Sequence, residues 1–69
     1  MNNNTKLEIA VEVLAAKIAI SSSMGYNVED EQMQLLIKQR QQMYEGNKSV
    51  IDKIIKEYGP EVEAEYKKV

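Results

Sequence analysis

The sequence predicts an all-α fold, a small antiparallel bundle of three helices followed by a short C-terminal helix. Two observations favour this class. Apolar residues recur at intervals of three and four, the spacing that gathers them on one face of an α-helix. Strand-like alternation of useful length and internal repeats are both missing from the 69 residues. A chain of this length holds one domain, so residues 1–69 are expected to fold as a unit.

A capping-box pattern marks the start of the first helix. Thr5 is followed three residues later by Glu8, so the threonine hydroxyl can accept from a backbone amide while the carboxylate reaches back to the cap. We expect this helix over residues 6–22, because Gly25, just beyond a run of serines, can supply the left-handed turn that ends it. Residues 1–4 precede the cap and are expected to be a flexible tail.

The second helix is expected over residues 28–45. Asn27 is a favourable N-cap, and the acidic run 29–31 would lie in the first turn, where the helix dipole favours negative charge. Gly46 follows directly and can end the helix in a left-handed turn. This segment therefore carries start and stop signals at both ends.

Two shorter helices complete the predicted bundle. Ser49 opens a helix over residues 50–58, and the dipeptide Gly59-Pro60 is a strong break signal. Pro60 at a first helical position, with acids after it and lysines at the far end, indicates a separate short helix over residues 61–68.

The first helix is apolar on two sides. One stripe consists of Leu7, Ala10, Val11, Leu14 and Ile18. The second consists of Ile9, Val13, Ala16 and Ile20. A helix with two apolar sides has to be covered on both. We interpret the second stripe as an interface with another subunit; the alternative is that the last two helices cover it within one chain.

The second helix has one apolar stripe, formed by Met33, Leu36, Ile37, Met43 and Tyr44. Its other side is rich in glutamine, with Leu35 as the one large apolar side chain there. Arg40, the only arginine, falls within the stripe. Its guanidinium can grip a carboxylate or phosphate with two bonds, or it can lay its stem along the stripe with its head at the rim. Arg40 is therefore a candidate contact for a partner or an anion.

The composition argues against catalysis and against bound cofactors. The chain has no Cys and no His, so a nucleophile has no imidazole beside it, and the usual zinc ligands are missing. Helical spacing could pair Lys17 with a serine of the run 21–23, but serines at a helix end are the simpler interpretation. We expect no enzymatic activity, no cofactor and no metal.

Charge and hydropathy limit the classes of partner that the chain is expected to bind. The net charge is −2, without the basic stripe that is typical of nucleic-acid binders. The apolar run 7–20 is interrupted by charges and is shorter than the roughly 20 residues that span a bilayer. With no signal peptide and no Cys, a cytoplasmic location is expected.

The sequence thus favours a non-enzymatic protein–protein interaction module, a small helical adaptor or inhibitor that binds itself and another protein. Small acidic chains of this kind are typical of phage and mobile-element products that bind a host protein. The alternative is a helix-turn-helix protein that binds nucleic acid, in which residues 50–58 would read the bases. That segment offers Lys53 and Lys56 but no Arg, Asn or Gln, so nucleic acid is the less favoured partner.

Overall fold

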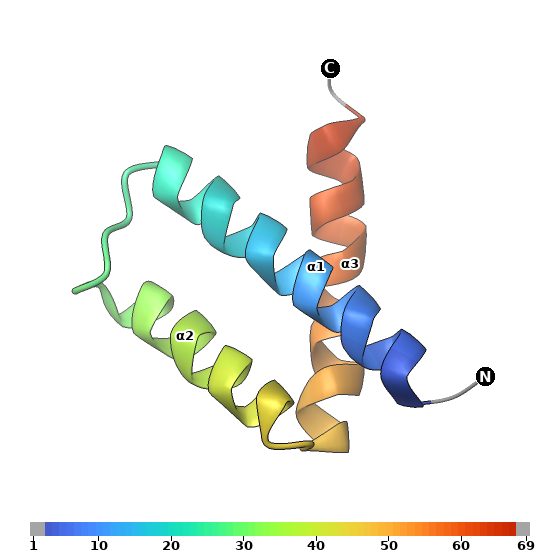
Figure 1. Ribbon diagram of the computed structural model, residues 1–69. Coiled ribbons are helices and arrows are strands. Elements are labelled where there is room, and N and C mark those ends of the chain that lie inside the picture. Colours follow the sequence, from blue (N-terminus) through green and yellow to red (C-terminus); the bar gives the residue numbers. More distant parts are fainter. Residues whose placement is uncertain (1–2, 68–69) are drawn as a thin grey trace.

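The computed structural model describes residues 3–67, and within them the chain forms α1 (Asn3–Ser23), α2 (Glu31–Tyr44) and α3 (Lys48–Tyr66). All regular structure in this part is helical, which confirms the predicted all-α class. α1 and α2 run antiparallel in the foreground of Figure 1, and α3 crosses behind α1 at a steep angle. α1 contacts both other helices and packs most extensively on α3.

The molecule is flat. Its Cα atoms span 35 × 29 × 14 Å, and the shortest dimension corresponds to two helix layers, with α1 and α2 in one and α3 in the other (Figure 1). A flat arrangement of three short helices buries few side chains completely. The surface therefore retains apolar residues that a larger domain would cover.

The core lies where the three helices meet. Its buried members are Ala10, Leu14, Met33, Leu36, Met43, Ile51 and Ile54. Those from α1 belong to the first apolar stripe, and those from α2 to the single stripe predicted there. The helical periodicity therefore identified the buried apolar residues of both helices, although Tyr44 of the predicted α2 stripe is 62% exposed.

Both predicted glycine turns are present. Gly25 has φ +102° and Gly46 has φ +87°, a backbone conformation that side-chain-bearing residues rarely adopt. After α1, Tyr26 N donates to Ser21 O at 3.1 Å, and after α2, Asn47 N donates to Gln42 O at 3.1 Å. These bonds satisfy carbonyls at the helix ends in the Schellman pattern.

The start of α2 differs from the prediction. Its N-cap is Asp30, and Asn27 lies outside the helix. Asn27 Oδ1 instead accepts from Glu29 N at 3.0 Å, while Asn27 N donates to Asp30 Oδ2 at 2.8 Å. Asn27 thus stabilises a turn that leads into α2, because its short side chain can bond the backbone two residues on as easily as it can cap a helix. Only Glu31 remains in the first turn.

The other two start signals were also misplaced. α1 begins at Asn3, so Thr5 lies inside the helix and is not its cap. The helix therefore starts within the predicted tail 1–4. Residues 1–2 of that tail lie outside the described part. α3 begins at Lys48, where Asn47 Oδ1 accepts from Val50 N at 3.2 Å. Asn47 is therefore the cap, and Ser49 is the second residue of the helix.

The predicted separate fourth helix over residues 61–68 is wrong. α3 continues through Pro60 to Tyr66, although proline cannot donate the intrahelical bond at its position and its ring crowds the preceding turn. Tyr58 and Val62 lie one turn apart on the face that packs on the other helices, and Val62 is only 7% exposed. Packing on both sides of Pro60 therefore holds the helix together against the local break signal.

Candidate interaction surfaces

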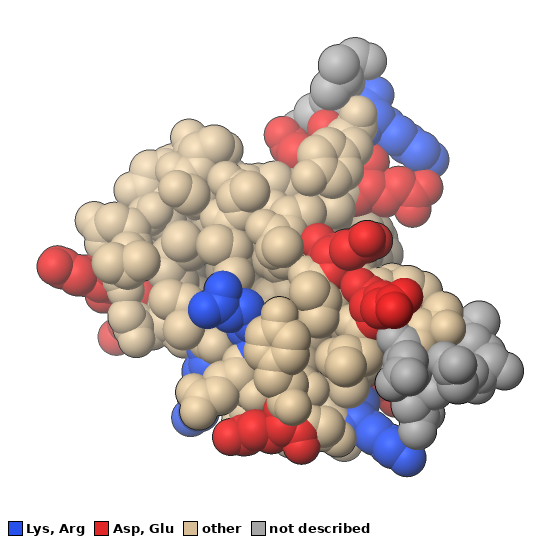
Figure 2. Space-filling view, viewed as in Figure 1, with Lys and Arg blue, Asp and Glu red and all other residues tan. Residues whose placement is uncertain are grey.

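The face that α1 and α2 present in Figure 2 is largely uncharged. Acidic side chains lie toward its left-hand, right-hand and lower edges, and few basic side chains interrupt the uncharged area. The exposed side chains of this small chain also include large apolar ones, among them Ile9, Leu35 and Tyr44. The surface therefore offers places where another protein could bury apolar area.

The second stripe of α1 is partly buried, and its first member, Ile9, remains 41% exposed. Two ion pairs join α1 to α3, Lys6 Nζ to Asp52 Oδ1 at 3.5 Å and Lys17 Nζ to Glu61 Oε1 at 2.6 Å. The half-buried members of the stripe are Val13, Ala16 and Ile20.

Val13 packs against the core cluster, so a charge at Val13 would disturb the fold itself as well as any interface. Ile9 is the member through which a subunit contact could be probed without damage to the core. The subunit interface at this stripe stays a prediction.

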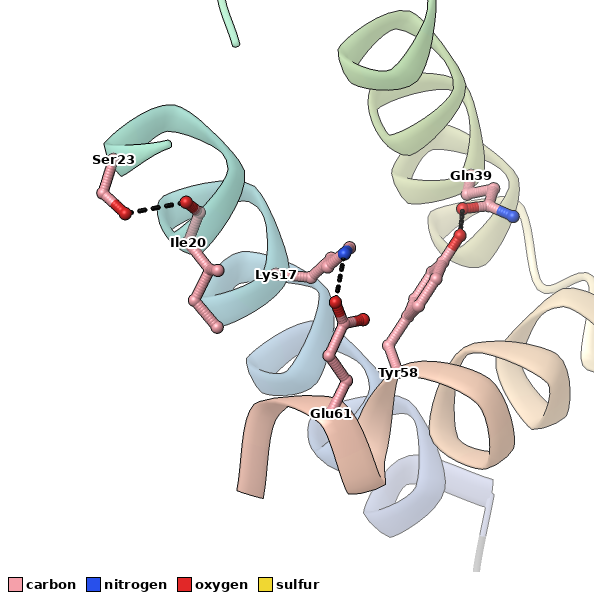
Figure 3. Close-up of polar contacts among 6 residues, drawn as sticks. All are labelled: Lys17, Ile20, Ser23, Gln39, Tyr58 and Glu61. Atoms are coloured by element: carbon pink, nitrogen blue, oxygen red, sulfur yellow. Dashed lines mark hydrogen bonds and ion pairs between the residues drawn. The ribbon is translucent and has the colours of Figure 1, made fainter. Parts of the chain in front are cut away.

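A polar network closes the gap between α1, α2 and α3 (Figure 3). The Lys17 ammonium lies 5.7 Å from the centre of the Tyr58 ring, within reach of a cation–π contact, and is paired with Glu61. The Tyr58 hydroxyl donates to Gln39 Oε1 at 3.0 Å. Gln39 is only 5% exposed, so this bond satisfies a buried amide oxygen. The sequence pattern placed Gln39 on the solvent side and did not find this contact.

Next to this network lies a groove, a hollow of about 280 Å³ lined by Lys17, Ser21, Gln32, Leu35, Leu36 and Tyr58. Leu36 is buried in its floor, whereas Leu35 is 52% exposed. Leu35 is the one large apolar residue on the glutamine-rich side of α2, and it forms one side of this open groove. Ser21 and Lys17 also line the groove, but Lys17 is paired with Glu61 and the two do not form a nucleophile–base pair.

Arg40 is exposed and makes no ion pair with any described residue. It lines a shallow hollow together with Ile37, Gln41, Tyr44 and Glu45. Tyr44 is 62% exposed. The guanidinium is therefore free to contact a partner, and an apolar surface lies beside it.

The same tyrosine lines a second hollow at the junction of α1 and α2. That hollow is formed by Leu7, Glu8, Val11, Glu12 and Tyr44. Glu8 and Glu12 are exposed and one turn apart, and within the described residues neither has a lysine or arginine partner. Tyr44 thus lines both a hollow that contains Arg40 and Glu45 and a hollow that contains two acids.

The outer face of α3 carries interleaved charges. Asp52 stands one turn from both Lys48 and Lys56, and Lys53 Nζ approaches Glu57 Oε2 at 3.9 Å. A duplex-binding helix would present its lysines without acids between them. Acids therefore alternate with the lysines along this part of α3.

No cluster of three or more metal-ligating side chains occurs among residues 3–67. In the same range no helix has the length and apolar character to cross a bilayer. The chain matches no known family model, no curated protein and no solved structure. Its function has to be inferred from its own residues and their geometry.

Proposed function

We propose that this chain is a non-enzymatic protein–protein interaction module, a small cytoplasmic adaptor or inhibitor that acts as a homo-oligomer and binds another protein. The supporting observation is the exposure of large apolar side chains, from 36% for Tyr26 to 70% for Met24, in a chain of this size. Monomeric soluble proteins generally avoid contiguous apolar patches, and such patches mark contact surfaces.

The groove beside Leu35 fits an apolar anchor from a partner helix. Leu36 provides an apolar floor, Tyr58 an aromatic wall and Leu35 an exposed rim. Lys17 and Glu61 are already paired at one edge, so an uncharged side chain can enter without leaving either charge without a partner. Helix-in-groove recognition of this type uses a few apolar anchors spaced by one helical turn.

The experiment compares the Leu35→Glu and Ser49→Glu variants. Leu35 lines the groove, whereas Ser49 is exposed in the first turn of α3 and lines none of the hollows described above. Both changes add one acid, and both positions are exposed, so both proteins should remain folded by circular dichroism. A partner captured by the wild-type chain is identified by mass spectrometry, purified, and titrated against each variant by calorimetry.

We expect the Ser49→Glu variant to bind as the wild type does and the Leu35→Glu variant to bind at least about tenfold more weakly, because a charge in the apolar groove loses its hydration. Equal binding by both variants would exclude the groove as the contact. If no purified protein bound the wild-type chain, the adaptor function itself would be rejected.

A further inference from the structure

The arrangement around Tyr44 has a property that the other surfaces lack. Its exposed ring lines two hollows at once, one containing Arg40 and the other containing Glu8 and Glu12. The apolar side chains Leu7, Val11 and Ile37 lie in the same two hollows. This face therefore combines an aromatic centre and apolar surroundings with Arg40 and Glu45 in one hollow and the two acids Glu8 and Glu12 in the other.

These three charges lack partners in the part of the chain that the structure describes. Neither Arg40 nor either acid takes part in an ion pair there, although Lys6, Lys17, Lys53 and Lys67 all do. Two acids one helical turn apart repel each other. Glu45 also lines the hollow of Arg40, without forming a bond to it within 4.0 Å. A partner that brought cations to Glu8 and Glu12 and an anion to Arg40 would relieve the imbalance.

We infer that this face, defined by Arg40, Tyr44, Glu8 and Glu12, is a two-fold self-association surface whose occupant is a second copy of this chain. In an isologous contact, residue i of one copy meets residue j of the other, and j meets i. Half a turn about an axis near Tyr44 places Arg40 of each copy opposite Glu8 and Glu12 of the other. The inference rests on the proposed function, since it names the face through which the homo-oligomer forms.

A second copy suits this face better than other partners do. Phosphates would meet Arg40 but also three acids, Glu8, Glu12 and Glu45, which repel them. A basic partner would satisfy the acids and leave Arg40 opposed by like charge. Only a surface that presents both signs in the reversed order satisfies both hollows, and this face is itself such a surface. An arginine–carboxylate contact can also be bidentate, which fixes the geometry of the pair.

The test uses charge reversal in two complementary variants. The first is Arg40→Glu, and the second carries Glu8→Arg together with Glu12→Arg. In the proposed dimer, each variant opposes like charges when paired with itself. In a mixture of the two, both contacts of the heterodimer regain opposite charges. Lys38→Glu serves as the matched control for the first variant, because Lys38 is exposed on α2 and lines none of the hollows described above.

Sedimentation equilibrium measures the dimer dissociation constant of each protein, with circular dichroism as the test of folding. We expect the wild type and the Lys38→Glu variant to dimerise alike, each reversal to raise the dissociation constant at least about tenfold, and the mixture to return to the wild-type value. If the double reversal unfolds α1, Glu8→Gln with Glu12→Gln takes its place and is expected to weaken the dimer by removing the acids.

Three results would overturn the inference. A wild-type chain that stays monomeric at millimolar concentration removes both this face and the homo-oligomer of the proposed function. A dimer that Arg40→Glu leaves intact and Ile9→Glu dissociates keeps the homo-oligomer and moves its interface to the second stripe of α1. A dimer that each reversal weakens but the mixture does not restore excludes the pairing of Arg40 with the two acids.

Discussion

The two flanks of α1 differ in how completely the chain covers them. On the flank toward α3, Lys17 is paired with Glu61 and lies over Tyr58, and Val62 is buried. On the flank toward α2, the hollow between the two helices ends at the exposed ring of Tyr44. α3 has 19 residues and crosses α1, whereas α2 has 14 and lies beside it. Lys17 on the α3 flank is thus paired and half-buried, whereas Tyr44 on the α2 flank is largely exposed.

The largest effect is expected at Pro60, inside α3. Pro60→Ala should increase the free energy of unfolding by about 1–3 kcal/mol, because alanine restores the missing amide and removes the ring crowding in a helix interior. The gain is reduced by the greater freedom of the unfolded chain without proline. Urea unfolding measures it. Gly59→Ala is the control, since a Cβ there meets no atom within 4 Å, and it should contribute about 0.5–1 kcal/mol.

A Pro60→Ala protein less stable than the wild type would mean that the α3 flank depends on a bend at Pro60 and not on a continuous helix. The face shared by Tyr58 and Val62 would then need another explanation.

The helix ends and Pro60 show which features of the fold can be predicted from the sequence and which cannot. The turns at Gly25 and Gly46 were predictable because a positive φ is a local demand that glycine meets by itself. The continuation of α3 through Pro60 was not predictable, because a local break signal was outweighed by packing on residues far away in the sequence. The cap at Asp30 was missed since Asn27 has two local uses of similar strength, a helix cap and a turn.

The candidate surfaces divide in the same way. Leu35 and Arg40 stood out in the helical pattern, one as an apolar residue on a polar side and the other as a charge within an apolar stripe. The groove and the two hollows at Tyr44 depend on how α1 meets α2 and α3. Helical periodicity places residues on one helix and carries no information about which residues of another helix lie opposite, so these sites required the structure.

A smaller loss is expected from the buried hydrogen bond on the α3 side. Tyr58→Phe removes the hydroxyl that donates to Gln39 Oε1 at 3.0 Å, and Gln39 is 5% exposed. An unsatisfied buried acceptor should lower the free energy of unfolding by about 1–2 kcal/mol. Urea unfolding of Tyr58→Phe is compared with that of Tyr44→Phe, whose ring is 62% exposed and whose change should leave stability unaltered. Equal stabilities of the two variants would mean that the Tyr58 hydrogen bond contributes nothing to the free energy of unfolding.

The smallest effect on folding is expected at Arg40, on the open side. Arg40→Ala should cost less than about 1 kcal/mol of unfolding free energy at concentrations where the chain is monomeric, because the exposed guanidinium has no ion pair among the described residues. A loss of about 3–5 kcal/mol would instead indicate that a buried charge had been left without its partner, and Arg40 would then be a structural residue of the monomer. At higher concentration the same variant should lose the additional stability that dimer formation gives the wild type. A small loss of unfolding free energy in the monomer, together with a larger loss at concentrations where the wild type dimerises, is expected for a residue whose partner belongs to another copy.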